Sequence, residues 1–320
     1  MTTKHHLFGH PDLREVRVPV ATVWTSPEAP RELDACAVAD LPDMTAWIAE
    51  LDAEGTMERR HGLHGRTLTQ LLLGEPALVL EERGEWARVA ALSQRSSAHE
   101  EGYPGWVRRA HLGRPVDRAD GPTAFVTRAS AMLTRADGTV FEVSCGTGWW
   151  TDDVTDEQVT VLLPDGDTGT LRRTDVRLSH KQEQASYSPG DLLDTARQFL
   201  GTRYLWGGTS AWGLDCSGLV HLTFRAQRAV VPRDAFDQAA DSRKLRRIDL
   251  DVVEPGDLYF FQRPGEKVYH VGFATRPVAE DGSRWMLHAP ESGDQHVVDE
   301  PMPAERLEVL VGAGRVNSHG

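Results

Sequence analysis

The spacing of the hydrophobic residues changes near residue 188 of this chain, and that change limits the folds that the chain can adopt. From about residue 15 to 178 the apolar residues form short runs separated by glycine-containing turns, which is typical of strands in small barrels. After residue 188 the spacing becomes that of helices, and strands return from residue 258. The sequence therefore predicts small all-β units followed by an α+β domain.

Two β-rich stretches precede the change, and they look like a module repeated in tandem. The first is interrupted by helical periodicity over 41–53, where Met44, Ile48 and Leu51 share one face. The second has Asp-Gly turns between its strands. The expected parts of the chain are a polar segment (1–14), a first barrel with a helical insertion (15–118), a second barrel (119–180), a linker (181–189) and the α+β domain (190–320).

The α+β domain opens with two expected helices. Ser188, Pro189 and Asp191 have the order of an N-cap, a first-turn proline and a capping carboxylate. Gly201 is expected to end that helix, and a second helix is expected to start at Cys216. The expected buried face of the first helix consists of Leu192, Leu193, Ala196, Phe199 and Leu200, and that of the second of Leu219, Val220, Thr223 and Phe224. Expected strands follow at 258–261, 270–275, 284–289 and 309–316.

Composition excludes several classes of protein. Asp and Glu outnumber Lys and Arg by 48 to 35, which argues against a nucleic-acid binder. No apolar run approaches the roughly 20 residues that span a bilayer. The polar start of the chain lacks the apolar stretch of a signal peptide. His5, His6 and His10 have no partner at metal-ligand spacing. We therefore expect a cytoplasmic protein with reduced thiols and no metal or cofactor.

Cys216 is the clearest candidate for a catalytic residue. It follows a glycine-rich loop in GLDCSGLV, at the expected first turn of a helix, where backbone amides and the helix dipole lower a thiol pKa. The alternative is a buried apolar filler, which we expect for Cys36 and Cys145. His270 and His288 lie at the ends of two later strands. A cysteine on a helix with histidines on following strands suits nucleophilic catalysis.

Three motifs in order carry a family resemblance. YLWGGTSAWGLDCSGLV, HVGFAT and MLHAP together resemble the NlpC-type cell-wall cysteine peptidases, a compact papain-like family, over residues 190–316. Upstream, LTQLLLGEPALVL, GEWARV and GYPGWV resemble the bacterial SH3-like domains of one branch. Members of that branch are γ-D-glutamyl-L-diamino acid endopeptidases that recycle murein peptides. The resemblance implies a papain-like catalytic domain preceded by two SH3-like barrels.

The resemblance also implies catalytic roles. Cys216 would be the nucleophile, and His270 the general base and acid. His288 would orient His270, and Tyr204 would join the Cys216 backbone amide in the oxyanion hole. Without the resemblance, Tyr204 and Trp206 would be read as aromatic packing on a glycine-rich loop.

Further residues are expected to bind substrate. Asp215 could pair with the free α-amine of L-Ala-γ-D-Glu, and Ser217 could bond the peptide backbone. In this branch an acid and a tyrosine of the first SH3-like domain close the pocket around that amine, and they map onto Glu75 and Tyr103. The alternatives are a solvated turn residue and a packing aromatic. The substrate-binding set is Asp215, Ser217, Trp206, Glu75 and Tyr103.

The expected activity is hydrolysis of the γ-D-glutamyl-L-diamino acid bond of short murein peptides by a monomer. Ala235 stands where the branch often has a hydroxyl residue, which leaves fine specificity open. The nature of the diamino acid, diaminopimelate or lysine, also stays open. The alternatives are a peptidoglycan-binding protein with a degenerate catalytic domain, and a related thiol amidase or transpeptidase.

Overall fold

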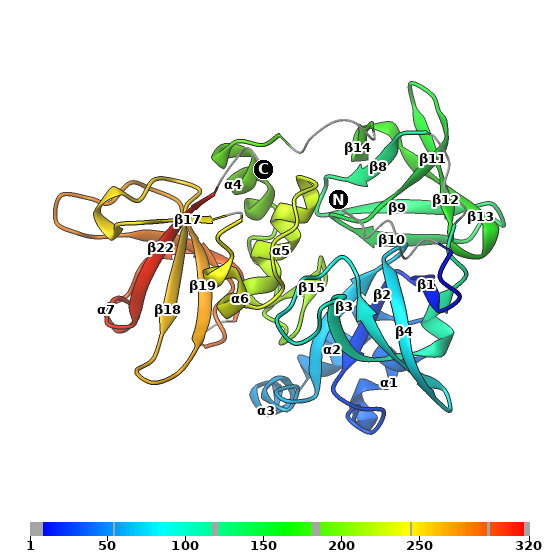
Figure 1. Ribbon diagram of the computed structural model, residues 1–320, viewed down its shortest axis with the longest axis horizontal. Coiled ribbons are helices and arrows are strands. Elements are labelled where there is room, and N and C mark those ends of the chain that lie inside the picture. The colour runs from blue at the N-terminus through cyan, green and yellow to red at the C-terminus, as the bar shows by residue number, and fades with distance from the viewer. Residues whose placement is uncertain are drawn as a thin grey trace.

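Three large sheets succeed one another along the described part of the chain in the computed structural model (Figure 1), and a two-stranded sheet, β15-β16, precedes the third. The structure describes residues 9–53, 55–116, 121–180, 186–243, 245–292 and 295–316. Residues 1–8 of the expected polar segment, residues 117–120 around the expected junction of the barrels, and residues 181–185 of the expected linker lie outside the described residues. Among the described residues, no helix is long and apolar enough to cross a membrane.

The first sheet is antiparallel, with the strand order β3-β2-β6-β5-β4-β1-β7. Alternate side chains point into its core, so that Ala21, Val23 and Val89 are fully buried. Its strands are β1 (Leu13–Val16), β2 (Val20–Trp24), β3 (Thr67–Leu72), β4 (Pro76–Arg83), β5 (Trp86–Ala91), β6 (Tyr103–Arg108) and β7 (Leu112–Gly113).

A helical insertion separates β2 from β3, as the periodicity over 41–53 predicts. Met44 and Leu51 are buried on α2 and so is Trp47, whereas Ile48 is only half-buried. Asp43 caps α2 by accepting a hydrogen bond from Ala46 N at 2.9 Å. The insertion consists of η2 (Glu32–Asp34), α1 (Ala35–Val38), α2 (Met44–Leu51) and α3 (Thr56–His61).

The second sheet repeats the topology of the first. Its order is β10-β9-β13-β12-β11-β8-β14, which is the order of the first sheet with every strand number raised by seven. This shared order identifies a duplicated module whose sequence similarity is weak. Its strands are β8 (Thr123–Val126), β9 (Ser130–Arg135), β10 (Val140–Ser144), β11 (Gly148–Val154), β12 (Gln158–Leu163), β13 (Asp167–Arg172) and β14 (Val176–Ser179). Short 3-10 turns occur in both β-rich parts: η3 (Arg109–His111) is in the first, and η4 (Pro164–Gly166) and η5 (Arg173–Asp175) are in the second.

The third part combines helices with a six-stranded antiparallel sheet of order β17-β22-β18-β19-β20-β21. Helix α5 packs against β19 and lies between this sheet and the two β-rich parts (Figure 1). The elements are α4 (Pro189–Arg197), β15 (Thr209–Ser210), β16 (Gly213–Leu214), α5 (Cys216–Ala226), α6 (Ala235–Ala240), β17 (Leu245–Ile248), η6 (Leu250–Val252), β18 (Leu258–Gln262), β19 (Val268–Ala274), β20 (Trp285–His288), β21 (Val298–Pro301), α7 (Ala304–Leu307) and β22 (Leu310–Val316).

Helix α4 begins as predicted and ends earlier than predicted. The Ser188 hydroxyl accepts from Asp191 N at 3.1 Å, and the Asp191 carboxylate accepts from Ser188 N at 2.7 Å, which completes a capping box. The α-helical residues stop at Arg197, and the chain then turns through Gly201 at φ +82°. Leu200 is consequently 47% exposed, so its expected place on the buried face is wrong.

The first β-rich part packs directly against the loop that precedes Cys216. The Gln70 side-chain oxygen accepts from Thr209 N at 3.1 Å and from the Ser210 hydroxyl at 2.9 Å. Thr67 donates to the Trp206 carbonyl at 2.9 Å. These buried contacts fix the position of the loop, so one face of the first barrel forms part of the surroundings of Cys216.

Candidate active site

Cys216 is the first residue of α5, as predicted. Asp215 is its N-cap and accepts a hydrogen bond from Gly218 N at 2.6 Å. Gly218 is required for close packing, because a Cβ there would lie 2.0 Å from the Gly208 carbonyl oxygen. The side chain of Cys216 is 7% exposed, and its Sγ lies 3.8 Å from the Tyr269 carbonyl on β19.

The two predicted histidines form a linear hydrogen-bonded chain with an acid. His270 Nε2 lies 2.8 Å from His288 Nδ1, with the rings nearly perpendicular at 88°. His288 Nε2 lies 3.1 Å from Glu300 Oε1 on β21. Gly272 leaves room for this arrangement, because a Cβ there would lie 2.9 Å from the Cβ of His288. The sulfur of Cys216 lies against the residue that precedes His270.

The acceptor at the end of this chain sets the tautomers. The hydrogen bond from His288 lowers the pKa of Glu300, so the carboxylate is ionised and accepts only. We therefore assign the proton of His288 to Nε2, which leaves Nδ1 to accept from His270 Nε2–H. Nδ1 of His270 is then free of a proton. This is the form of imidazole that a general base requires.

Burial sets the protonation of Cys216 and His270 differently from the expectation. Burial raises the pKa of the Cys216 thiol to about 12, and the neighbouring Asp215 carboxylate adds to the rise, whereas nearby backbone N–H groups offset only part of it. Burial and the neighbouring His288 ring hold the pKa of His270 well below its ordinary value. The resting pair is therefore a neutral thiol and a neutral imidazole. The direction of the Cys216 shift is opposite to the lowered thiol pKa expected at a helix start.

Tyr204 pairs through its backbone with Leu214, two residues before Cys216. Burial raises the pKa of the Tyr204 phenol well above its ordinary value, and negative charge at Cys216 and Asp215 adds to the rise. The backbone of Tyr204 is held by Arg60, which donates to its carbonyl at 2.5 Å, and by Gln295, whose carbonyl accepts from Tyr204 N at 2.7 Å. A protonated phenol held beside the nucleophile can donate a hydrogen bond to a developing oxyanion.

Asp215 and Ser217 are engaged within the protein. The buried Arg233 guanidinium forms a two-point pair with Asp215, with its Nη atoms 3.0 and 2.6 Å from the two carboxylate oxygens. The Ser217 hydroxyl accepts from Arg233 at 2.9 Å and donates to Asp215 at 3.2 Å. The structure thus assigns Asp215 to an internal ion pair rather than to a substrate amine.

Tyr103 reaches this region from β6 and finds a different acid from the one expected. Its hydroxyl lies 3.0 and 3.2 Å from the carboxylate oxygens of Asp234, the residue at the N-cap of α6. Asp234 directly follows Arg233 in the chain and precedes the buried Ala235. Burial is the first cause of a raised pKa at both Tyr103 and Asp234. The sequence motifs do not identify Asp234 as the acid beside Tyr103, although Asp234 directly precedes Ala235.

Glu75 is not part of this cluster, and its expected role is wrong. Its carboxylate is buried, contacts Arg225, and accepts from Leu72 N at 3.0 Å. Arg225 is nine residues beyond Cys216 on α5, about 13 Å along a helix that rises about 1.5 Å per residue. Arg225 also donates to the Gly146 carbonyl of the second β-rich part at 2.7 Å. The pair therefore holds the three parts of the chain together.

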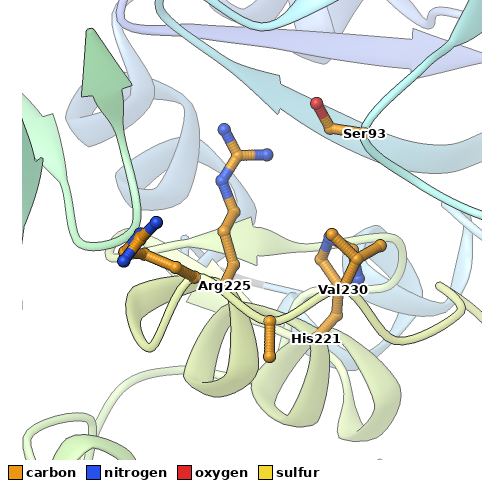
Figure 2. Close-up of a pocket in the computed structure, with 6 residues that line it drawn as sticks. Ser93, His221, Arg225 and Val230 are labelled. Atoms are coloured by element: carbon orange, nitrogen blue, oxygen red, sulfur yellow. The ribbon is translucent and has the colours of Figure 1, made fainter. Parts of the chain in front are cut away.

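A small cavity lies beside this three-way junction. Figure 2 shows Arg225 and His221 on α5 and Ser93 on the facing segment of the first β-rich part. Burial lowers the pKa of His221 to about 3, and its Nε2 finds no hydrogen-bond partner among the described residues. The cavity of about 10 Å³ has the space of about one water molecule.

Trp206 is two residues beyond Tyr204, and its side chain contacts His64. The His64 ring stacks on Trp206 with ring centroids 3.9 Å apart and planes inclined by 35°. His64 Nε2 also lies 3.1 Å from Glu291 Oε1. His64 comes from the turn before β3, and Glu291 follows β20. The site therefore has side chains from the first β-rich part on two of its walls.

Comparison with known proteins places this geometry in a family. Residues 201–311 match the NlpC/P60 family, and residues 59–112 match the bacterial dipeptidyl-peptidase SH3 domain. The gamma-D-glutamyl-L-lysine dipeptidyl-peptidase of Bacillus cereus is 30% identical over 286 residues, which cover 87% of this chain and 83% of that protein. The Bacillus subtilis protein of the same name is 32% identical over 279 residues, which cover 86% of this chain and 88% of that protein.

Solved structures agree with this placement. The crystal structure of an NlpC/P60 family protein from Bacillus cereus matches with a TM-score of 0.85 at 29% identity, and the match covers 95% of this chain and 99% of that one. An NlpC/P60 endopeptidase from Photobacterium damselae subsp. piscicida shares the fold, with a TM-score of 0.65 at 15% identity, over 97% of this chain and 74% of that one. The resemblance seen in the motifs and the predicted fold class are confirmed. With its thiol beside a histidine pair and its likeness to peptidases over most of its length, the chain belongs to the NlpC/P60 family of cysteine peptidases.

Proposed function

We propose that this protein hydrolyses the γ-D-glutamyl-L-diamino acid bond of short murein peptides that carry a free N-terminal L-Ala. The observation that supports the proposal is the hydrogen-bonded chain from His270 through His288 to Glu300, with the Cys216 sulfur 3.8 Å from the carbonyl of Tyr269, the residue before His270. The names of the two relatives at 30% and 32% identity support the choice of bond.

The neutral resting pair defines the first chemical step. As the Cys216 sulfur attacks the γ-glutamyl carbonyl, its proton moves to Nδ1 of His270. The imidazolium then gains from the hydrogen bond to His288 and from the charge of Glu300 beyond it. The Cys216 backbone N–H and the Tyr204 hydroxyl would hold the oxyanion, and each such donor contributes about 2.7–4 kcal/mol in well-studied cases.

The second half of the reaction reverses the proton transfer. His270 gives its proton to the amine of the departing diamino acid, so the carbon–nitrogen bond breaks and an acyl-enzyme remains on Cys216. Water, deprotonated by the same imidazole, attacks the thioester and releases L-Ala-D-Glu. Hydrolysis and transfer to another amine differ in this step, and the mass of the product distinguishes a peptidase from the alternative amidase or transpeptidase.

Recognition of the N-terminal amine falls to Tyr103 and Asp234 in this proposal. Their buried oxygens lie within 3.2 Å of each other, and the Asp234 carboxylate is the acid that Glu75 was expected to supply. A peptide extended beyond L-Ala would leave this acid without its ammonium partner and would meet the barrel. Such closure excludes longer peptides by shape and by unpaired charge.

The test is cleavage of synthetic L-Ala-γ-D-Glu-L-Lys, followed by mass spectrometry. The Cys216→Ala variant is expected to lose turnover completely, because no other described thiol lies at the histidine chain. Acetylation of the L-Ala amine is expected to reduce kcat/KM by about a hundredfold, since it leaves a buried charge unpaired, at about 3 kcal/mol. Retained turnover in the variant would end the proposal, and an unchanged rate on the acetylated peptide would end the assignment of Tyr103 and Asp234.

We also infer that the enzyme acts as a single chain inside the cell, on peptides recovered from the wall. Support for the location comes from the three free cysteines, which suit a reducing compartment. Cell fractionation and size-exclusion chromatography with light scattering test both points. A dimer, or a protein found with the wall fraction, would contradict them.

A further inference from the structure

A second acidic group lies beside Tyr204, on a different wall from Asp234. Glu291 is three residues beyond His288, on the turn that follows β20. Burial is the first cause of the raised pKa of Tyr204, and the charge of Glu291 adds to the rise. Gln295 links the two segments, because its side chain donates to the Glu291 carbonyl and its own carbonyl accepts from Tyr204 N at 2.7 Å.

The surroundings of Glu291 hold it in place and leave it accessible. Its Oε1 lies 3.1 Å from His64 Nε2, and the His64 ring is in turn stacked on Trp206. The Glu291 backbone carbonyl accepts from Gln295 Nε2 at 2.5 Å. The side chains of His64 and Glu291 are 37% and 40% exposed, so a ligand can reach the carboxylate.

The charge of Glu291 has no cationic partner. Within the described ranges, its ion-pair contact is with His64 alone, whereas Asp215 and Glu75 each contact an arginine. Burial of the His64 ring lowers its pKa, the charge of Glu291 opposes this and the neighbouring His61 adds to it, so the net shift is downward and favours the neutral imidazole. A carboxylate hydrogen-bonded to a neutral imidazole keeps its negative charge and can receive an ammonium group.

The proposed substrate carries ammonium groups on both sides of the bond that breaks. One is the α-amine of L-Ala, assigned above to Asp234 and Tyr103. The other is on the side chain of the diamino acid, and the diamino acid is the residue that leaves when the bond breaks. His270 protonates that amine, so the leaving residue lies toward β19 and β20. Glu291 is on the turn at the end of β20, where that side chain is expected.

We propose that Glu291 binds the side-chain ammonium of the diamino acid, and that it selects a leaving residue with a free amine, such as lysine. The inference rests on the proposed function and deepens it by naming the chemistry recognised on the leaving side. His64 and Trp206 position the carboxylate, with the imidazole donating one hydrogen bond and the indole supporting the ring. The two acids on separate walls then match the two ammonium groups of one tripeptide.

The test compares two tripeptides that differ only in that ammonium. L-Ala-γ-D-Glu-L-Lys and L-Ala-γ-D-Glu-L-norleucine have similar leaving amines, but norleucine ends in a methyl group. The enzyme is expected to cleave the lysine peptide with about tenfold higher kcat/KM, mainly through KM, which corresponds to about 1.4 kcal/mol. In Glu291→Gln the preference is expected to fall to within twofold, while the norleucine peptide is cleaved as fast as before.

The norleucine peptide and a second variant keep the result interpretable. Unchanged turnover of that peptide by Glu291→Gln shows that the variant is folded and active. The matched control His64→Gln retains a neutral donor and is expected to keep at least half of the lysine preference. If the unmodified enzyme cleaves both peptides equally, or if Glu291→Gln keeps the preference, the inference is wrong while the proposed function stands. If neither peptide is cleaved, the proposed function itself fails.

Discussion

At the scale of single residues, the direction of each hydrogen bond in the site follows from one carboxylate. Glu300 can only accept, so the proton on His288 faces Glu300 and the proton on His270 faces His288. This order leaves the one unprotonated nitrogen of His270 for the thiol. Glu300 is therefore a positioning residue that acts on the nucleophile through two rings.

Removing the charge of Glu300 tests this order. Glu300→Gln keeps the size of the side chain but loses the charge that stabilises the imidazolium formed during attack. We expect kcat to fall about tenfold with KM unchanged, and the lower pKa of the kcat profile to move, because that pKa reports the histidine chain. Glu280→Gln, at an exposed position, is the matched control. An unchanged kcat and an unchanged pH profile would show that Glu300 has only a structural role.

The raised pKa of the thiol makes a second prediction at this scale. A Cys216 thiol with a pKa of about 12 stays protonated at neutral pH, and its thiolate forms only as the pH rises towards that value. Alkylation by iodoacetamide is expected to be slower than that of a free cysteine at pH 7 and to increase up to pH 10 without a plateau. Mass spectrometry of the Cys216 peptide measures this rate. A plateau reached below pH 7 would demonstrate a resting thiolate.

At the scale of elements, the site depends on how closely α5 approaches the loop before it. The first turn of α5 presses against Gly208, and the cap residue Asp215 is tied to the same loop through Gly207 N at 2.9 Å. The strands β19 and β20 place their histidines side by side because Gly272 has no side chain. Two glycines, on a helix and on a strand, therefore permit the approach of the reactive groups.

Gly218→Ala tests the tight approach of α5. The added Cβ would lie 2.0 Å from the Gly208 carbonyl oxygen, and a backbone shift is unavoidable, at a cost of about 1–3 kcal/mol. We expect a lower melting temperature and a loss of kcat of at least tenfold. Gly190→Ala, on α4, is the control, because its Cβ would meet only the Ser188 hydroxyl at 3.5 Å. Equal activities of the two variants would mean that α5 tolerates the shift.

At the scale of the whole molecule, the three parts of the chain converge on α5. Its N-terminus carries the nucleophile beside the first β-rich part, and its C-terminal turn contacts both β-rich parts through Arg225. Arg177 of the second part also donates to the Ala226 carbonyl at 2.7 Å. The second barrel therefore supports the helix at the end opposite the reaction.

Glu75→Gln tests the division between support and catalysis. The variant leaves Arg225 buried without its charged partner, and we expect unfolding to become easier by about 3 kcal/mol. Well below the melting temperature, kcat/KM is expected to stay within twofold of the original. The double variant with Arg225→Met is expected to regain part of the lost stability, which calorimetry measures. A raised KM with an unchanged melting temperature in Glu75→Gln would indicate that Glu75 binds substrate after all.

Local sequence patterns determined much of this protein. The capping order at Ser188, the helix start at Cys216 and the position of His288 at the end of β20 depend on neighbours within a few residues, and the structure agrees with each. His270 is on the expected strand, but it is the third residue of β19 rather than the first. The weak similarity of the two β-rich stretches was sufficient to suggest the duplication that the strand order shows. These features follow from periodicity and capping, which act over short distances along the chain.

Only the tertiary structure decided the charges and partners in the site. Whether Tyr103 meets Glu75 or Asp234 depends on contacts between residues 131 positions apart, and spacing within a motif says nothing about them. The protonation of Cys216 likewise depends on burial by β19 and on the charge of Asp215, which outweigh the effect of the helix start. Desolvation and long-range pairing arise only in the folded protein, because both require residues that are distant in sequence to pack against one another.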